Sequence, residues 1–431
     1  MPVQSVIVLF DVGKTNKKAF LLDEQYKIVW EQSQFLPETT DEDGDVCEDV
    51  EKLTNWVQRT YAHALTLRDF SIKAVNFSAY GASFVHIGKN GEPVTPLYNY
   101  LKPYPEALKK RFYDDYGGEV TLSMLTASPV LGSLNSGMQL YRIKKERPDL
   151  YEQIRYSLHL PQYLSFLLTG QKYSDITSIG CHTNLWNFSQ DHYHEWVYRE
   201  GIIDKLAPIR GAEDVLPVGR QVSGIGLHDS SAAMIPYLES FQEPFVLIST
   251  GTWCISMNPF NHVPLTVAEL QKDCLCYISY QGRPVKASRL FAGYEHEQRV
   301  KRLAAHYHKD PSYAATVAYD PDIVSLVHKQ GTEEDRNFEQ AYHRLIMDIM
   351  AQQAVSTQLV LQGTDVRRIF VDGGFARNQV YMHLLATAFP HIEVFAANIP
   401  QATAIGAALA IHSHWNSRQI PGDIIELKFY K

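Results

Sequence analysis

Hydrophobic positions follow two different periods in the first part of the chain. Continuous apolar runs at 6–10 and 17–22, separated by a polar turn, predict a hairpin whose first strand is buried. Apolar residues every three or four positions at 48–65 predict an amphipathic helix. The same reasoning predicts two further strands, at 72–77 and 84–87.

The second half of the chain repeats the opening pattern. An apolar run at 245–249 ends in a polar turn, as the run at 6–10 does, and follows a linker-like stretch at 239–244. The pattern, without sequence identity, predicts two related α/β domains, residues 1–238 and 239–431, with a cleft between them. Further expected elements are helices at 335–361, 378–389 and 402–412, strands at 368–371 and 392–395, and a helix within 151–168 that Pro161 kinks or starts.

Composition narrows the class of protein. The formal net charge is −8 and 45% of the residues are hydrophobic, which is ordinary for a globular protein. The mild acidity argues against a nucleic-acid partner, because such proteins carry a basic surface. With no run of about 18 apolar residues and no basic leader, we expect neither a membrane span nor a secretory signal. The cysteines are too few and scattered for a disulfide framework, which favours a reducing cytoplasm: Cys47, Cys181, Cys254, Cys274 and Cys276.

Two small groups could in principle bind a metal ion. Cys274 and Cys276 are one residue apart, and we expect them on opposite faces of a strand, with no second ligand pair nearby. His192 and His194 lie in a polar stretch that is typical of a solvated loop. The favoured interpretation is a pair without metal for the cysteines and a solvated loop for the histidines.

The turn after the first strand carries residues that suit a phosphate group. A glycine lets the backbone approach a ligand, successive N–H groups form an anion-binding nest, and hydroxyl and lysine side chains add to it. An acid before the glycine can hold Mg²⁺, usually through water. The alternative is a plain hairpin turn, since no Walker pattern is present. The residues concerned are Asp11, Gly13, Lys14, Thr15 and Asn16.

Two turns in the second half have a similar character. Thr250, Gly251 and Thr252 follow a predicted strand, and Gly373 and Gly374 lie between a predicted strand and a predicted helix. Glycines leave room for a ligand against the backbone, and the N-terminus of a helix favours phosphate. The alternative is a plain turn between a strand and a helix, without a binding role.

Asp229 opens a run of small residues close to the predicted domain boundary. The run predicts a tightly packed helix, in which Asp229 is either an N-terminal cap or a general base that faces the cleft. Phosphoryl transfer needs a group that takes the proton of the acceptor hydroxyl, together with a metal and phosphate clamps. Asp229 and the three turns together indicate a two-domain kinase.

These motifs resemble the FGGY carbohydrate kinases of the actin/Hsp70/hexokinase-like superfamily, over nearly the whole chain. The resemblance implies an α/β fold of two actin-like (ribonuclease H-like) domains with an ATP and sugar cleft between them. It also implies ATP and Mg²⁺, with Asp11 anchoring the metal directly or through water. The matching residues are Asp11, Gly13, Thr15 and Lys18 in a first phosphate loop, Gly251 and Thr252 in a second, and Gly373, Gly374, Asn378 and 401–408 in an adenosine segment.

Within the family, the sequence is most similar to the rhamnulokinase branch. The similarity lies in the stretch 80–85 and in His228, Asp229 and Ser230. It implies that Gly81, His228 and Ser230 touch the sugar and that Asp229 is the base that activates its 1-hydroxyl.

The sequence also departs from that branch. Ser83 stands where the branch has an acid, and residues 98–102 replace an acid-plus-arginine sugar motif. Lys14 and Lys17 stand where small residues are expected, and 288–300 lacks the asparagine pattern of the branch. These departures bear on the sugar more than on the reaction.

The expected function is transfer of the γ-phosphate of MgATP to the 1-hydroxyl of a ketose, L-rhamnulose in the first instance. The alternatives are a kinase for fuculose, xylulose or ribulose, and a non-catalytic nucleotide-binding protein on the same fold. Trp186 is a candidate stacking partner for the sugar or a core residue. We expect a cytoplasmic monomer or homodimer that binds the sugar and ATP, and neither nucleic acid nor membrane.

Overall fold

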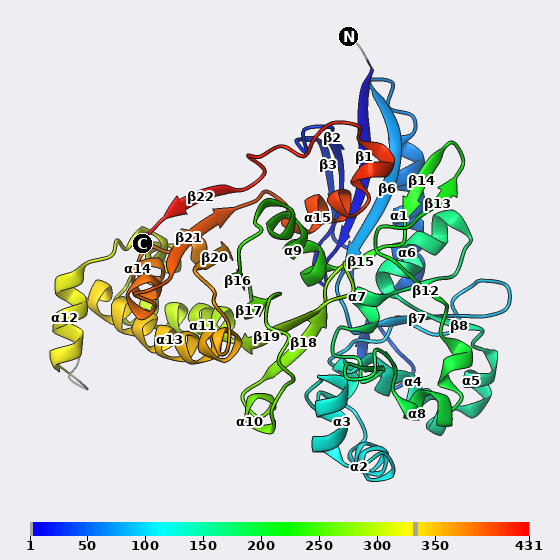
Figure 1. Cartoon of the computed structure of the whole chain (residues 1–431), viewed down its shortest axis with the longest axis horizontal. Helices are drawn as coiled ribbons and strands as arrows, with labels where there is room; N and C mark the ends of the chain where they lie inside the picture. The colour runs from blue at the N-terminus through cyan, green and yellow to red at the C-terminus, as the bar shows by residue number, and fades with distance from the viewer. Residues whose placement is uncertain (1–2, 331–334, 431) are drawn as a thin grey trace.

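The computed structural model describes residues 3–330 and 335–430, and its two halves lie side by side (Figure 1). Each half is built on a seven-stranded sheet. The first sheet has the order β13 (Val215–Val218), β14 (Gln221–Gly224), β6 (Phe70–Ala79), β1 (Gln4–Val12), β2 (Lys17–Asp23) and β3 (Ile28–Gln34), with β15 (Leu227–His228) also paired to β6. The second has the order β18 (Cys274–Ile278), β19 (Pro284–Leu290), β17 (Cys254–Asn258), β16 (Phe245–Thr250), β20 (Arg368–Gly373), β21 (Glu393–Asn398) and β22 (Glu426–Phe429).

The two sheets share one arrangement around their first strands. β1 pairs antiparallel with β2 and parallel with β6, and β16 pairs antiparallel with β17 and parallel with β20. The first strands are buried over most of their length, as expected for strands covered on both faces. The predicted α/β class and the repeat of the opening pattern are therefore confirmed.

Helices cover the sheets and fill the space between the halves. α9 (Asp229–Ser240) and α15 (Ala402–Ala410) pack closely against each other, and α15 also packs on β1 and β6 (Figure 1). The other long helices are α1 (Val50–Ala64), α2 (Glu106–Asp115), α4 (Ser136–Glu146), α6 (Leu160–Thr169), α11 (Ala292–His306), α12 (Pro321–Gln330), α13 (Phe338–Leu361) and α14 (Gln379–Ala388).

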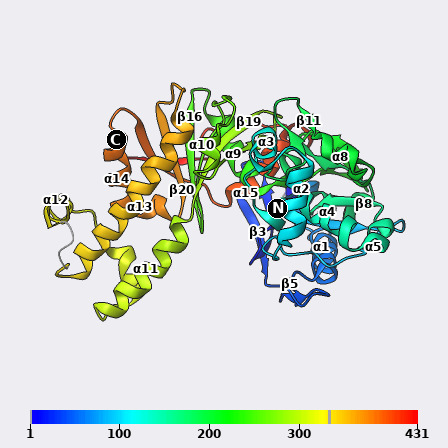
Figure 2. The same ribbon diagram turned by 90° about the horizontal axis from the view of Figure 1, so that it is seen from below.

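One hydrophobic cluster belongs to both halves. It contains Ile7 and Leu9 of β1, Leu247 of β16, Phe370 of β20 and Ile405 of α15, all of them buried. The view from below also shows the first half and the second half meeting at α9 and β19 (Figure 2). The halves are thus joined by shared packing as well as by the chain.

Several expected boundaries differ from the structure. The stretch 151–168 forms the end of α5 (Pro148–Gln153), then β8 (Tyr156–His159) and α6, so Pro161 starts a helix, in its first turn. β20 continues through Gly373, because Gly373 pairs with Thr250 across the sheet, so the turn expected from Asp372 begins two residues later, at Gly374. α9 runs to Ser240, which shortens the linker to 241–244.

The expectation that Cys274 and Cys276 face opposite sides of a strand is wrong. In β18 both side chains enter one buried cluster, whereas Leu275 between them enters the cluster shared by the two halves. Side chains alternate along a strand with a period of two, so residues two apart share a face. Both thiols are unpaired and buried, which fits a packing role.

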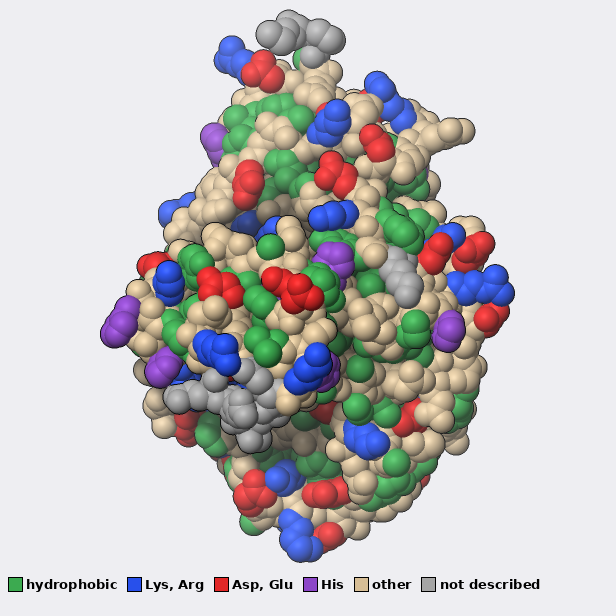
Figure 3. Space-filling view, turned by 90° about the vertical axis from the view of Figure 1, so that its left-hand side faces the viewer, with side chains coloured by type: hydrophobic (Ala, Val, Ile, Leu, Met, Phe, Trp, Pro, Cys, Tyr) green, Lys and Arg blue, Asp and Glu red, His purple; other side chains and the backbone are tan. Residues whose placement is uncertain are grey.

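Among the described residues, no helix has the length and apolar character that crossing a membrane requires. The face that carries α12 shows acidic and basic side chains interspersed (Figure 3). This face therefore does not present the basic stripe that nucleic-acid binders use.

Candidate active site

The turn between β1 and β2 is shaped by its own backbone. The N–H of Gly13 donates to the carbonyl of Asn16 at 3.0 Å. Thr15 and Asn16 are exposed at the tip, and Lys18 lies opposite Asp11 in the β1–β2 register. Phosphate binding at this turn stays a prediction.

The two lysines that depart from the family pattern are held by one carboxylate. Glu48 is buried and lies 2.7 Å from the ammonium of Lys17 and 3.4 Å from that of Lys14. Its other hydrogen bond, at 2.7 Å, comes from the hydroxyl of Tyr80. Lys14 also pairs with Glu38 at 3.1 Å. Lys14 and Lys17 therefore stabilise the turn. Lys18 has no short ion pair, since its ammonium lies 3.8 Å from the carboxylate of Glu31.

Asp11 ends the buried part of β1 and faces α15. Its Oδ2 accepts a hydrogen bond of 2.8 Å from the hydroxyl of Thr403. Burial raises the pKa of Asp11 to about 6, and the charge of nearby Asp229 adds to the rise, while Thr403 and Lys18 oppose it. A buried carboxylate beside a second carboxylate is a setting that a divalent cation would relieve. The residues present therefore fit Mg²⁺.

Asp229 is the first residue of α9. Its Oδ1 accepts hydrogen bonds from the Ser230 N–H at 2.6 Å and the Ser230 hydroxyl at 3.2 Å, and lies 3.2 Å from His228 Nε2. The side chain is 34% exposed. The N-terminus of a helix is a favourable place for a carboxylate, and this side chain is open to a substrate.

His228 is enclosed by the first half. Its Nε2 lies 3.2 Å from the sulfur of Cys181, and its ring is buried. A Cβ added to Gly81 would lie only 2.9 Å from the imidazole and 3.0 Å from that sulfur. Gly81, expected to touch the sugar, thus also provides the space for His228. Burial lowers the pKa of His228, partly offset by Asp229.

The second turn is tied to the third through Thr250. Its hydroxyl donates to the carbonyl of Asp372 at 2.5 Å and accepts from the Phe375 N–H at 3.0 Å, and its carbonyl accepts from the Gly374 N–H at 2.9 Å. Gly373 has a φ of +90°, and a Cβ there would lie 2.0 Å from that carbonyl. Gly373 therefore allows β16 and β20 to approach closely. Gly374, the next residue, lines the neighbouring cavity.

A cavity of about 900 Å³ opens between the second turn, α11 and the start of α14. Gly251, Gly374 and Asn378, three of the expected nucleotide-binding residues, line it. Asn378 caps α14 and donates to the hydroxyl of Tyr342 at 2.8 Å. Its size and its place beside two glycine turns suit a nucleotide. Further lining residues, not found from the sequence, include His296, Lys301, Tyr342 and Arg377.

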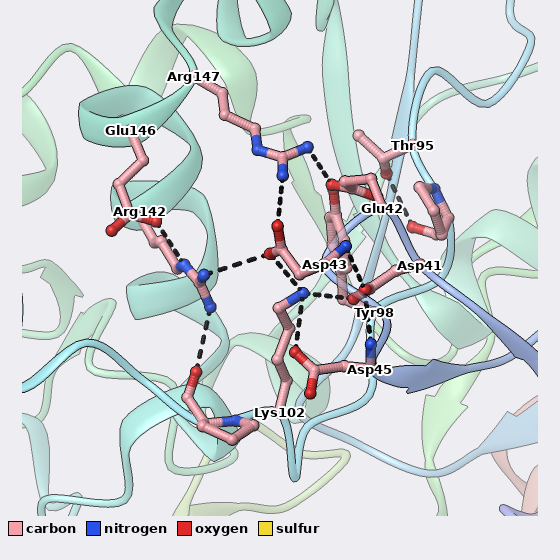
Figure 4. A network of polar contacts seen from close by, with 12 residues as sticks. Asp41, Glu42, Asp43, Asp45, Thr95, Tyr98, Lys102, Arg142, Glu146 and Arg147 are labelled. Carbon is pink, nitrogen blue, oxygen red and sulfur yellow. Dashed lines mark hydrogen bonds and ion pairs between the residues drawn. The ribbon is translucent and has the colours of Figure 1, made fainter.

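Lys102, at the end of the segment 98–102, is held in an ionic network (Figure 4). The ammonium of Lys102 lies between three carboxylates: it contacts Asp41, and is 2.8 Å from Asp43 and 3.2 Å from Asp45. Those acids are the one cluster of three or more potential metal ligands in the described part of the chain, and Lys102 already lies between them. Arg147 fixes Asp43 from the other side at 2.8 Å.

Ser83 is buried, and its hydroxyl lies 3.4 Å from the carbonyl of Tyr98. The serine that replaces an acid therefore faces the segment that replaces the sugar motif, so the two departures lie together.

Two other candidates have structural roles. Trp186 is buried against Tyr193 in a cluster of the first half, which favours the core interpretation. His192 lies in the short strand β11 (His192–Tyr193), and His194 caps α8 (Glu195–Arg199).

Two family models match the chain. The model described as "FGGY family of carbohydrate kinases, N-terminal domain" matches residues 6–215, and "Carbohydrate kinase FGGY, C-terminal domain" matches residues 242–419. The chain belongs to the FGGY family of carbohydrate kinases. As an FGGY kinase it is a phosphotransferase with a sugar hydroxyl as acceptor and ATP as donor.

Named relatives of this FGGY kinase act on different sugars. A rhamnulokinase of Halalkalibacterium halodurans is 22% identical over 97% of this chain and 95% of its own. An L-fuculokinase of Escherichia coli is 24% identical over 59% of this chain and 56% of its own. The structure of a carbohydrate kinase from Novosphingobium aromaticivorans superposes with a TM-score of 0.82, at 22% identity, over 99% of this chain and 94% of that one. The fold is thus shared, and the sugar is not determined by these likenesses.

Proposed function

We propose that this FGGY kinase transfers the γ-phosphate of ATP to the 1-hydroxyl of a ketose, with L-rhamnulose as the favoured sugar. The observation that carries the reaction is the placement of Asp229, a partly exposed carboxylate at a helix N-terminus whose Oδ1 is held by neighbouring donors. The sugar is supported by the resemblance to the rhamnulokinase branch and by rhamnulokinases among the relatives. Fuculose, xylulose and ribulose are the alternatives.

We place ATP across the cleft, in the positions that the family pattern implies. Gly13, Lys14, Thr15, Asn16 and Lys18 border its phosphates from the first half, with Lys14 acting through the turn that it braces. Gly251, Thr252, Gly374 and Asn378 border the nucleotide from the second half. The 900 Å³ cavity, which Gly251, Gly374 and Asn378 line, supports three of these assignments. Gly373 keeps the loop close to Thr250. Asp11 would hold Mg²⁺, which neutralises phosphate charge when bound.

In this mechanism each residue acts on a stated atom. Gly81, His228 and Ser230 border the sugar and keep its 1-hydroxyl beside Asp229. The carboxylate takes the hydroxyl proton while the hydroxyl oxygen bonds to the γ-phosphorus, and the bond from that phosphorus to the oxygen of ADP breaks. Closure of the cleft would exclude water, which otherwise competes as acceptor.

The same proposal assigns sugar binding and the base to residues 1–238 and ATP binding to residues 239–431. The two sheets and the gap between the family matches, 216–241, support a boundary in this region. A cytoplasmic location is supported by five unpaired cysteines. We expect a monomer or homodimer.

The test is ADP release with MgATP across a panel of ketoses. Wild type is expected to respond to L-rhamnulose, and Asp229→Asn to lose about 10²- to 10⁴-fold in kcat while binding ATP normally, because loss of a general base has costs of this size. Asp322→Asn, an exposed first-turn acid of α12, is the matched control and should be unchanged. Turnover on another ketose would move the proposal to that sugar. Wild-type turnover in Asp229→Asn would remove the base assignment, and silence on all sugars with ATP bound would favour a non-catalytic protein.

A further inference from the structure

Glu48 joins two segments that are expected to meet different substrates, the phosphate turn (13–18) and the sugar loop (80–83). It precedes α1 and is only 5% exposed. Its carboxylate lies 2.7 Å from the ammonium of Lys17 in the phosphate turn. It also accepts a hydrogen bond of 2.7 Å from the hydroxyl of Tyr80 in the sugar loop. One buried carboxylate therefore contacts both segments.

We propose that Glu48 is a positioning residue, which sets the distance between the sugar and the γ-phosphate by holding the sugar loop and the phosphate turn together. This inference rests on the proposed function, since it concerns the alignment of the same two substrates. Reacting atoms must approach to about 3–3.5 Å, and a displacement of about 1 Å caused by a remote change can cost about 10²-fold in rate. Glu48 itself touches neither substrate in this proposal, so its effect is on alignment.

On the phosphate side, two lysines connect Glu48 to the turn. The side chain of Lys17 is 1% exposed, and its ammonium also donates to the carbonyl of Lys14 at 2.9 Å. The ammonium of Lys14 lies 3.4 Å from Glu48. Removing one partner of a buried ion pair leaves the other charge uncompensated. Loss of the Glu48 charge is therefore expected to displace Lys17 and, with it, the backbone of the turn.

On the sugar side, Glu48 is connected through one hydroxyl and one backbone bond. Burial and the charge of Glu48 raise the pKa of Tyr80 well above its usual value, so the hydroxyl keeps its proton and is the donor. The ring of Tyr80 packs edge-on against that of Tyr100, at 5.8 Å between centroids. The backbone N–H of Glu48 donates to the carbonyl of Leu97 at 3.2 Å. Glu48 therefore anchors the sugar loop and the neighbouring segment 98–102 together.

The sheet holds the strands that lead to these segments but ends before their tips. The pairing of β1 with β6 ends at Val12 and Ala79, and that of β1 with β2 ends at Val12 and Lys17. A further backbone bond joins the Tyr80 N–H to the carbonyl of Val12 at 3.2 Å. Beyond these ends, the contacts of Glu48 join the two tips.

Steady-state kinetics on the sugar that the panel identifies provide the first test. Glu48→Gln keeps the size of the side chain but removes the charge that holds Lys17. Its kcat should fall by about 10- to 100-fold, with the KM for sugar and for ATP within about threefold, because alignment is lost rather than binding. Tyr80→Phe removes only the hydroxyl and should lower kcat by about 3- to 10-fold. The double variant should lose no more than Glu48→Gln alone, since both changes break one contact.

Glu269→Gln is the matched control, because Glu269 is also a buried acid in an ion pair. It lies in α10 (Val267–Leu270) of the second half, 2.8 Å from the buried ammonium of Lys286. This variant should lower stability and leave kcat unchanged. A raised KM with normal kcat in Glu48→Gln would make Glu48 a binding residue and overturn the proposal. An equal loss of kcat in Glu269→Gln, or additive losses in the double variant, would overturn it as well.

Backbone hydrogen exchange of the unliganded protein, followed by mass spectrometry, tests the link without any turnover. In Glu48→Gln, exchange should rise in the peptides of the phosphate turn and of the sugar loop together, because one contact protects both. Glu269→Gln should raise it in neither. A rise confined to peptides around Glu48 would overturn the proposal even if no sugar substrate had been found. A wild type that turns over no sugar would count against the proposed function alone, because the exchange result does not depend on it.

Discussion

Carboxylates of this protein differ by the number of donors that surround them. Glu48 receives two ammonium groups and a hydroxyl, which makes it part of the framework of the first turn. Asp11 receives one hydroxyl bond and keeps a raised pKa. Asp229 accepts two hydrogen bonds on one oxygen, both from Ser230. Of these three, only Asp11 and Asp229 retain capacity for a ligand or a proton.

Asp175 has one hydrogen-bonded oxygen and one buried oxygen without a partner. From this arrangement we predict that the stability of the protein depends on pH. Its Oδ1 caps α7 (Ile176–Ile179), accepting from the Thr177 N–H at 2.9 Å, whereas its Oδ2 is buried without a partner. Burial raises the pKa of Asp175 from 3.8 to about 7. The folded state thus holds a proton that the unfolded state releases, so this contribution is full below pH 3.8 and is lost as pH rises to about 7. The loss is at most about 4 kcal/mol.

Asp175→Asn is expected to remove this decline, because the amide keeps the cap and cannot ionise. Denaturant unfolding of variant and wild type at pH 4.5 and 8 should show the variant gaining relative stability at pH 8. Asp310→Asn is the control: Asp310 is an exposed cap whose pKa is lowered by bonds to Ser312, so the sign there is opposite. A relative stability of Asp175→Asn that does not change with pH would contradict the prediction.

The site residues divide into those that local sequence could find and those that it could not. Gly13 and Asp229 could be proposed from the sequence because a turn glycine and a helix-opening acid have recognisable neighbours. The pairing of Lys14 with Glu38 and Glu48 was not found, because the partners are 24 and 34 positions away and meet only through the fold. His296 and Tyr342 were missed for the same reason: they come from two helices that meet at one cavity.

At the scale of elements, helices and strands with a strong hydrophobic periodicity were predicted well, whereas short elements were not. β7 (Phe84–Ile87) has the predicted bounds, and α1 agrees within two residues at its start and one at its end. The helix expected at 402–412 is instead α15 followed by α16 (His412–Trp415), since apolar residues continue past Ala410 although the helix does not. Short strands such as β8 owe their existence to pairing with a distant strand, which periodicity does not report.

Asn76 is the polar link between three elements, and it predicts a large effect of a small change. From β6 its Nδ2 donates to the carbonyl of Ala407 in α15 at 2.8 Å, and its Oδ1 accepts from the Gly226 N–H at 3.2 Å. Asn76→Asp keeps the shape but removes the donor and places an acid against a carbonyl in a buried site. We expect a loss of roughly 2–4 kcal/mol in the free energy of unfolding, measured with denaturant.

The control for Asn76 is Asn55→Asp on the exposed side of α1, which should change stability by no more than about 0.5 kcal/mol. A loss of under about 1 kcal/mol in Asn76→Asp would show that β6 and α15 can separate without cost. The link would then have no part in holding the halves together.

At the scale of the molecule, the repeated sheets suggest two independent units, but the core does not. Leu9 of the first sheet and Leu247 and Phe370 of the second belong to one buried cluster, and α15 packs on α9, β1 and β6. The chain therefore crosses back to the first half near its end, and neither half buries its apolar surface alone. The sequence pattern predicted the repeat. It did not predict that the chain returns to the first half, because nothing in the sequence of helix 402–410 indicates which elements it packs against.

The shared core predicts that the protein unfolds in one cooperative transition. Calorimetry of the full chain should show a single endotherm, since separating the halves would expose the common cluster. We place a non-hydrolysable ATP analogue with Mg²⁺ mainly against the second half. At a concentration of 100 times its dissociation constant it should raise the free energy of unfolding by about 2.7 kcal/mol. The single endotherm should then move to higher temperature as a whole. The transitions followed by far-ultraviolet circular dichroism and by the fluorescence of the six tryptophans, which lie in both halves, should shift by the same amount. Two endotherms, or a shift confined to one of them, would mean that the cluster joins the halves too weakly to couple their stability.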